Sequence, residues 1–93
     1  MIRRDGETAS IEGAMTISGA TQLLAEGLEA IKASCSRIDL AGVTAVDSSG
    51  LAVVFGWVRT AQSMGRTLLI LNPPKNLLSL ATVYGVAELI PLG

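Results

Sequence analysis

The sequence predicts an α/β fold, a small, mostly parallel mixed sheet of four to five strands with helices packed on it. Three observations favour this fold class. Segments of β-type residues alternate with segments of helical periodicity, and strands separated by helices tend to pair in parallel through right-handed crossovers. Residues 67–71 form a continuous apolar run, which is typical of a strand covered on both faces. The β-type run 43–46 ends in Asp47, Ser48 and Ser49, residue types that begin helices.

The first third of the chain predicts a hairpin and a helix. After a polar opening over residues 1–7, the segments 8–11 and 14–18 alternate as two short strands, with Gly13 as the turn between them. Thr21 is the predicted cap of the next helix. The apolar residues that fall on one face of this helix are Leu23, Leu24, Leu28 and Ile31.

The rest of the chain predicts strands and helices in alternation. The elements are, in order, a strand from Arg37 to Leu40 that extends toward Val46, a helix over 51–65, a strand over 67–71, a last helix that starts at Pro74 or Asn76, and a short strand over 89–92. Gly85 after Tyr84 is typical of a helix C-cap. Because loops at the carboxyl ends of strands carry function in such sheets, Asp47 and Ser48 lie where a site is expected.

Asp47, Ser48 and Ser49 are the candidate regulatory residues. The unpaired N–H groups of a first helical turn and the helix dipole favour a phosphate, so a serine at this position is suited to carry a phosphoryl group. The alternative is that the three residues only cap the helix, as their side chains commonly do.

The helix after this junction has two apolar stripes. The stripe predicted to pack on the sheet contains Leu51, Val54, Phe55, Val58 and Gln62. The residues Val53, Trp57, Thr60 and Met64 recur on nearly the opposite face, and a helix resting on one layer of sheet cannot bury both stripes. We therefore expect the second stripe to bind a partner, since Trp and Met are enriched at interfaces. The alternative is that Trp57 packs between this helix and a neighbouring one.

Composition excludes several classes of function. The 93 residues predict one domain, residues 1–93, and 49% of them are hydrophobic. A net charge of −1 with one Phe, one Trp and one Tyr argues against nucleic-acid binding. The chain has no histidine and one cysteine, which argues against an enzyme, a metal site or a cofactor. No apolar run is long enough to span or insert into a membrane, and no secretory signal is visible.

Two segments resemble a known family. Residues 38–52, with the sequence Val-Thr-Ala-Val-Asp-Ser-Ser-Gly-Leu-Ala at their end, resemble the signature of STAS domains, which sulfate transporters and anti-sigma factor antagonists share. Residues 80–86 and 89–92 resemble the end of the STAS subunit of Mla-type phospholipid ABC transporters. Ser48 occupies the position that is phosphorylated in the antagonists. The chain departs from the family at residues 19–22, where an acidic residue is usual.

The resemblance implies a non-catalytic interaction subunit. Its partner would be the cytoplasmic ATPase of a phospholipid-transport ABC complex, whose assembly or activity it supports to maintain outer-membrane lipid asymmetry. The protein would be cytoplasmic and peripheral to the inner membrane through that complex, and docking would use the second stripe and Tyr84. The alternative is an anti-sigma factor antagonist that binds an anti-sigma kinase and is switched by phosphorylation at Ser48. The isolated chain could also form a homodimer through its apolar face.

Overall fold

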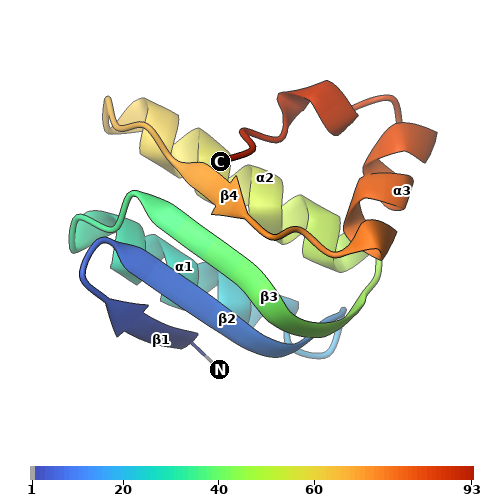
Figure 1. Ribbon diagram of the computed structural model, residues 1–93, viewed down its shortest axis with the longest axis horizontal. Helices are drawn as coiled ribbons and strands as arrows, with labels where there is room; N and C mark the ends of the chain where they lie inside the picture. The colour runs from blue at the N-terminus through green and yellow to red at the C-terminus, as the bar shows by residue number, and fades with distance from the viewer. Residues whose placement is uncertain (1) are drawn as a thin grey trace.

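The computed structural model describes residues 2–93, which form one mixed sheet and its helices (Figure 1). The elements are β1 (Ile2–Asp5), β2 (Thr8–Met15), α1 (Ala20–Lys32), β3 (Arg37–Val46), α2 (Ser48–Ser63), β4 (Leu69–Leu71), α3 (Lys75–Val83) and the short 3₁₀ helix η1 (Ala87–Leu89). The strand order is β1-β2-β3-β4. The β1–β2 pair is antiparallel, and β2–β3 and β3–β4 are parallel. The predicted fold class is therefore confirmed.

The hairpin lies earlier in the chain than predicted. Its strands are β1 and β2, and its two-residue turn contains Gly6, which has a φ of +63°. Glycine is common at the first position of a two-residue hairpin turn because it adopts positive φ without strain. Gly13 is part of β2, with a φ of +95°, at an irregularity in the pairing with β3. The predicted turn at Gly13 is thus wrong, and the predicted polar opening forms β1 over its described residues.

Helices cover one face of the sheet. In Figure 1, α1 and α2 lie behind the four strands and α3 lies beyond one end of β3 and β4. Ile70 of β4 points into the core, so Leu69 and Leu71 face the other side, where they are half-buried. Gly93 packs against both leucines, and Ile70 forms a parallel bridge with Leu92. The run 67–71 therefore does not mark a strand with helices on both faces, because the end of the chain covers its outer side.

Two helix starts differ in how well the sequence predicted them. α1 begins at Ala20 with Gly19 as N-cap and no side-chain cap, so the predicted capping role of Thr21 is wrong. α3 begins at Lys75 with Pro74 as its N-cap residue, between the two predicted starts at Pro74 and Asn76. It ends at Val83 with Tyr84 as its C-cap residue, and Gly85 follows with a φ of +72°, which confirms the predicted helix end.

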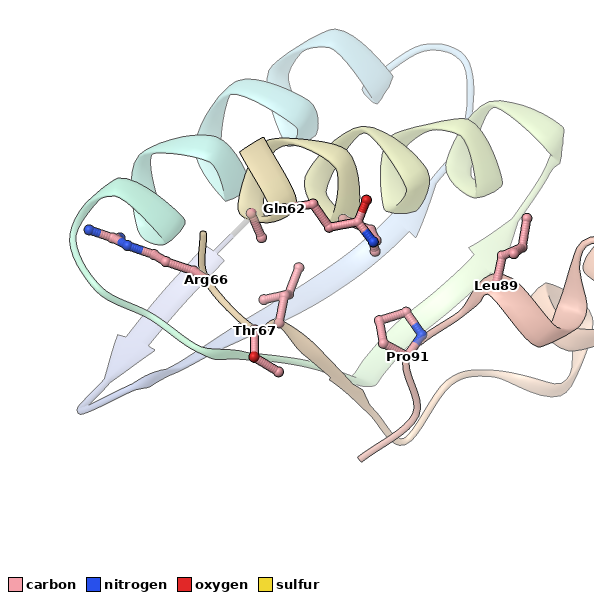
Figure 2. Close-up of a pocket in the computed structure, with 8 residues that line it drawn as sticks. Gln62, Arg66, Thr67, Leu89 and Pro91 are labelled. Atoms are coloured by element: carbon pink, nitrogen blue, oxygen red, sulfur yellow. The ribbon is translucent and has the colours of Figure 1, made fainter. Parts of the chain in front are cut away.

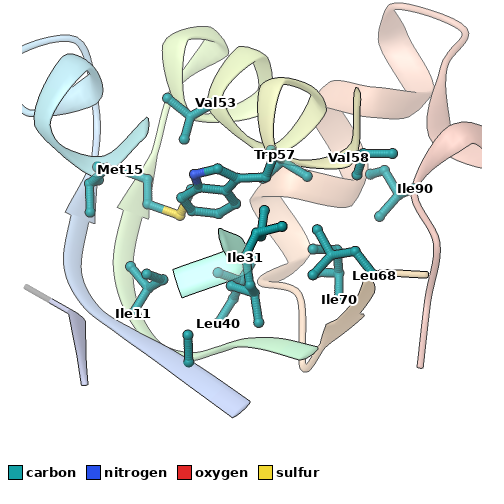
Figure 3. Packing of buried hydrophobic residues seen from close by; sticks show 14 of the residues in the cluster. Ile11, Met15, Ile31, Leu40, Val53, Trp57, Val58, Leu68, Ile70 and Ile90 are labelled. Carbon is teal, nitrogen blue, oxygen red and sulfur yellow. The ribbon is translucent and has the colours of Figure 1, made fainter. Parts of the chain in front are cut away.

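The core lies between the sheet and the two long helices, and Trp57 is its largest fully buried side chain (Figure 3). The indole is 0% exposed and points between Met15 of β2 and Ile31 of α1. Its Nε1–H donates to the carbonyl of Leu24 at 3.2 Å. Gly27 of α1 makes room for the ring, because a Cβ at this position would overlap the indole.

The second stripe of α2 is consequently not a docking surface. Val53 and Trp57 are buried and Thr60 is half-buried, so only Met64, at the end of the helix and 38% exposed, is open to a partner. The prediction failed because α2 packs on α1 as well as on the sheet. Two neighbours on different sides can bury two stripes, which a single layer of sheet cannot. In the structure Trp57 lies between α2 and the neighbouring α1, as the alternative prediction has it.

Candidate functional site

Asp47 closes β3 and caps α2. Its Oδ1 accepts the backbone N–H groups of Ser49 at 2.8 Å and Gly50 at 3.3 Å, which the first turn of a helix leaves unpaired. Its backbone carbonyl accepts from Gly50 and Leu51. The predicted cap is therefore present, and Asp47 supplies it alone.

The same carboxylate also holds a loop of the neighbouring strand. Its Oδ2 accepts the backbone N–H of Ile17 at 3.1 Å, and the Asp47 N–H donates to the carbonyl of Met15. Partial desolvation acts to raise the pKa of Asp47, but the N–H donors of Ile17, Gly50 and Ser49 and the Ser49 hydroxyl outweigh it. The pKa of Asp47 consequently lies below its ordinary value, because hydrogen bonds to the charged form favour that form.

Ser48 and Ser49 have different surroundings. Ser48 is the first residue of α2 and is exposed, and its hydroxyl makes no hydrogen bond within residues 2–93. Ser49 is half-buried, and its hydroxyl bonds to Asp47. A kinase could therefore reach the hydroxyl of Ser48 more easily than that of Ser49.

A phosphate on Ser48 would have few N–H groups to accept from. The N–H groups of Ser49, Gly50 and Leu51 already donate to Asp47. The new charge would stand beside a carboxylate, and like charges this close repel. The first turn of α2 is thus occupied by its own cap and is not arranged to neutralise a phosphate.

A groove of about 460 Å³ connects this junction to α3. Its lining residues are Val46, Asp47, Ser48, Asn76, Ser79, Leu80, Val83 and Tyr84. The structure therefore brings together Ser48 and Tyr84, two predicted site residues that are 36 positions apart in the sequence. It does not bring Val53, Trp57, Thr60 or Met64 into this groove.

Two exposed apolar residues of this region were missed by the sequence analysis. Val83, at the end of α3, is 80% exposed, and Ile17, in the loop between β2 and α1, is 78% exposed. Tyr84 beside Val83 is 58% exposed. Periodicity could not identify them, because Ile17 lies outside any helix and Val83 falls at a helix end. The position of Ile17 just after the carboxyl end of a strand is the sequence feature that would have indicated a place near the site.

A second hollow, of about 220 Å³, lies between the end of α2, β4 and the segment after η1 (Figure 2). Gln62, Thr67, Leu89 and Pro91 border it, and Arg66 extends toward the end of α1 to donate to the carbonyl of Ile31. The lining holds no pair of acidic side chains and no nucleophile with a base beside it, so its residues have no arrangement for catalysis.

The described part of the chain lacks the features of three other kinds of site. No three His, Cys, Asp or Glu side chains gather where they could hold a metal ion. None of the helices within residues 2–93 combines the length and the apolar character that crossing a membrane requires. Cys35 is buried and has no disulfide partner.

Comparison with known proteins gives results for sequence and for structure. The curated protein "Intermembrane phospholipid transport system binding protein MlaB" of Haemophilus influenzae is 33% identical over 52 residues. That alignment covers 56% of this chain and 50% of the relative, so the chain spans half the length of the relative it matches.

The solved structure of the anti-sigma factor antagonist SpoIIAA in its unphosphorylated form superposes with a TM-score of 0.72. The superposition covers 100% of this chain and 86% of that one at 17% sequence identity, which shows a shared fold. The family profile described as "Mlab, STAS domain" matches residues 2–91. Since this match extends over nearly the whole chain, the protein belongs to the STAS-domain family.

Proposed function

We propose that this protein is a non-catalytic STAS interaction subunit of an Mla-type phospholipid ABC transporter. It binds the cytoplasmic ATPase subunit and supports the assembly or activity of the complex, which maintains outer-membrane lipid asymmetry. The protein would lie in the cytoplasm, at the inner membrane through its complex. The likeness to an MlaB protein over 52 residues supports this partner class.

The observation that carries the proposal is the groove beside Ser48. Val83 and Tyr84 are large apolar side chains that remain exposed at its border, whereas side chains of this kind are commonly buried in the core of a small domain. Aromatic residues contribute strongly to interfaces, because they bury a large area at a small entropic cost. Docking would therefore use the start of α2 and the end of α3, not the length of α2 as the sequence suggested.

The test measures binding of the purified chain to the purified ATPase subunit of the same host by calorimetry. Tyr84→Ala should weaken binding by about tenfold or more, because truncation of an interface aromatic commonly costs at least that much. Met64→Ala is the matched control, since Met64 follows the far end of α2, about 24 Å from Ser48 by the helical rise. No binding of the wild-type chain, or equal losses for the two variants, would contradict the proposal.

A second candidate function is favoured by the free hydroxyl of Ser48. An anti-sigma factor antagonist switched by phosphorylation would need an exposed serine that a kinase can reach, and Ser48 is one. The partner would then be an anti-sigma kinase. Incubation of the chain with such a kinase and ATP, followed by mass spectrometry, would locate a phosphate on Ser48 if this function holds and none if it does not. Homodimer formation by the isolated chain stays a prediction, to be checked by light scattering.

A further inference from the structure

Asp47 makes more hydrogen bonds than a helix cap needs. Its Oδ1 serves Ser49 and Gly50 at the start of α2, and this is sufficient for capping. Its Oδ2 is directed to a different element and accepts the backbone N–H of Ile17. One carboxylate therefore joins α2 to the loop between β2 and α1.

This loop presents an apolar side chain to solvent. Residues 16–19 connect β2 to α1, and a turn closes where the N–H of Gly19 donates to the carbonyl of Thr16 at 3.1 Å. Ile17 at the tip is 78% exposed. The bond from the Ile17 N–H to Asp47 restrains the backbone at this tip.

The loop and the groove border the same junction. The backbone N–H of Ile17 donates to Asp47, and Asp47 lines the groove together with Ser48, Val83 and Tyr84. The side chains of Ile17, Val83 and Tyr84 are uncharged, and both oxygens of Asp47 are occupied. A surface of this composition fits an uncharged, apolar patch of a partner protein.

We infer that Asp47 is a positioning residue that holds Ile17 in place as an apolar anchor for the ATPase subunit. This inference rests on the proposed function for the identity of the partner. Oδ1 of Asp47 fixes the start of α2 and Oδ2 fixes the backbone of Ile17, so one carboxylate connects the loop to the groove that Ser48 lines. A phosphate on Ser48 places a strongly hydrated group in this groove, and its desolvation opposes docking.

Asp47→Asn separates the two roles of the carboxylate. Asparagine caps helices as well as aspartate does, and its amide oxygen can take the place of Oδ1. Its NH₂ group takes the place of Oδ2 and cannot accept the N–H of Ile17. The variant should lower the thermal midpoint less than Asp47→Ala does, because its amide oxygen still caps α2, while the amide proton of Ile17 exchanges several times faster by NMR and affinity for the purified ATPase subunit falls.

Ile17→Ser tests the anchor directly. It should lower affinity by about tenfold or more, because burial of one isoleucine contributes at least that factor. Leu89→Ser is the matched control, since Leu89 is also exposed and lies outside the groove beside Ser48, and its affinity should equal that of the wild type.

Three results would overturn the inference, and each is distinct. Unchanged exchange at Ile17 in Asp47→Asn would show that Asp47 does not position the loop. Equal affinities for Ile17→Ser and Leu89→Ser, with Tyr84→Ala still weakened, would remove Ile17 from the interface and leave the proposed function intact. No binding by the wild-type chain would contradict the proposed function and the anchor together, and the exchange rate would still decide the positioning role of Asp47.

Discussion

Substitution of Gly27 by alanine tests the packing of α1 against Trp57, which buries this side chain in the core. In an open helix this change stabilises by about 1 kcal/mol, because alanine is the better helix former. Here the new Cβ would lie 2.7 Å from Cδ1 of Trp57 and closer still to two other ring atoms. The ring cannot move away freely, because it is fully buried and its Nε1–H donates to Leu24.

The expected net effect is a loss of stability. Overpacking costs about 1–3 kcal/mol, and a displaced indole leaves a buried donor unpaired at a further cost of about 1–3 kcal/mol. After the gain in helix propensity, Gly27→Ala should lower the free energy of unfolding by roughly 1–5 kcal/mol. That is a large share of the ~5–15 kcal/mol typical of small domains.

Urea unfolding followed by far-ultraviolet circular dichroism measures this loss. Gly56→Ala is the matched control, because its Cβ would meet only Cδ1 at the end of the flexible Leu24 side chain, and its stability should change little or rise. In a Trp57→Leu background, Gly27→Ala should no longer destabilise, since the ring it meets is gone. A Gly27→Ala variant as stable as the wild type, or an equal loss in both backgrounds, would refute the packing argument.

Three further predictions concern the junction and the helix ends. Because the pKa of Asp47 is lowered on folding, the ionised carboxylate should stabilise the protein above the unfolded pKa of about 3.9, and this stabilisation should be lost as the pH falls through the folded pKa. In Asp47→Ala the free energy of unfolding should depend less on pH in this range. Parallel curves of this free energy against pH for the two proteins would contradict the prediction. Ser48→Asp should weaken ATPase binding and leave the thermal midpoint nearly unchanged, because Ser48 is exposed to solvent, whereas Ser49→Asp should lower the midpoint, because Ser49 is half-buried and its hydroxyl bonds to Asp47. Identical behaviour of the two variants would remove the distinction between the serines. Arg66→Ala should lower the free energy of unfolding by about 1 kcal/mol, because the carbonyl of Ile31 loses one of its two donors; urea unfolding that matches the wild type would show that this contact is not stabilising.

The sequence predicted an element correctly where the local preferences of a few neighbouring residues determine it. The strand that ends at Val46, the cap at Asp47 and the helix end before Gly85 follow from local preferences, and the structure has all three. The charged segment Ile2–Asp5 was not recognised as a strand, because an edge strand carries charges that resemble those of a loop. Gly13 was taken for a turn, since positive φ in a strand irregularity and in a turn require the same residue type.

The site was less predictable than the fold. Ser48 and Asp47 could be identified from their place between a strand and a helix, but their neighbours could not. The groove depends on how α3 returns to the end of β3, which is a long-range arrangement. The sequence predicts a surface position for Trp57 when the sheet is the one neighbour of α2. In the structure α1 is a second neighbour, and its Gly27 makes room for the ring.

We propose that this protein docks on the transporter ATPase through the surface around Ser48. The most direct test is a calorimetric titration of the purified ATPase subunit with the chain unmodified and with phosphoserine at position 48. Phosphorylation adds about −1.5 to −2 charge units beside Asp47, so the account predicts binding of the unmodified chain and an affinity at least about tenfold lower for the phosphorylated one. Both forms should have the same circular dichroism spectrum. Equal affinities, or the absence of binding by the unmodified chain, would contradict the account.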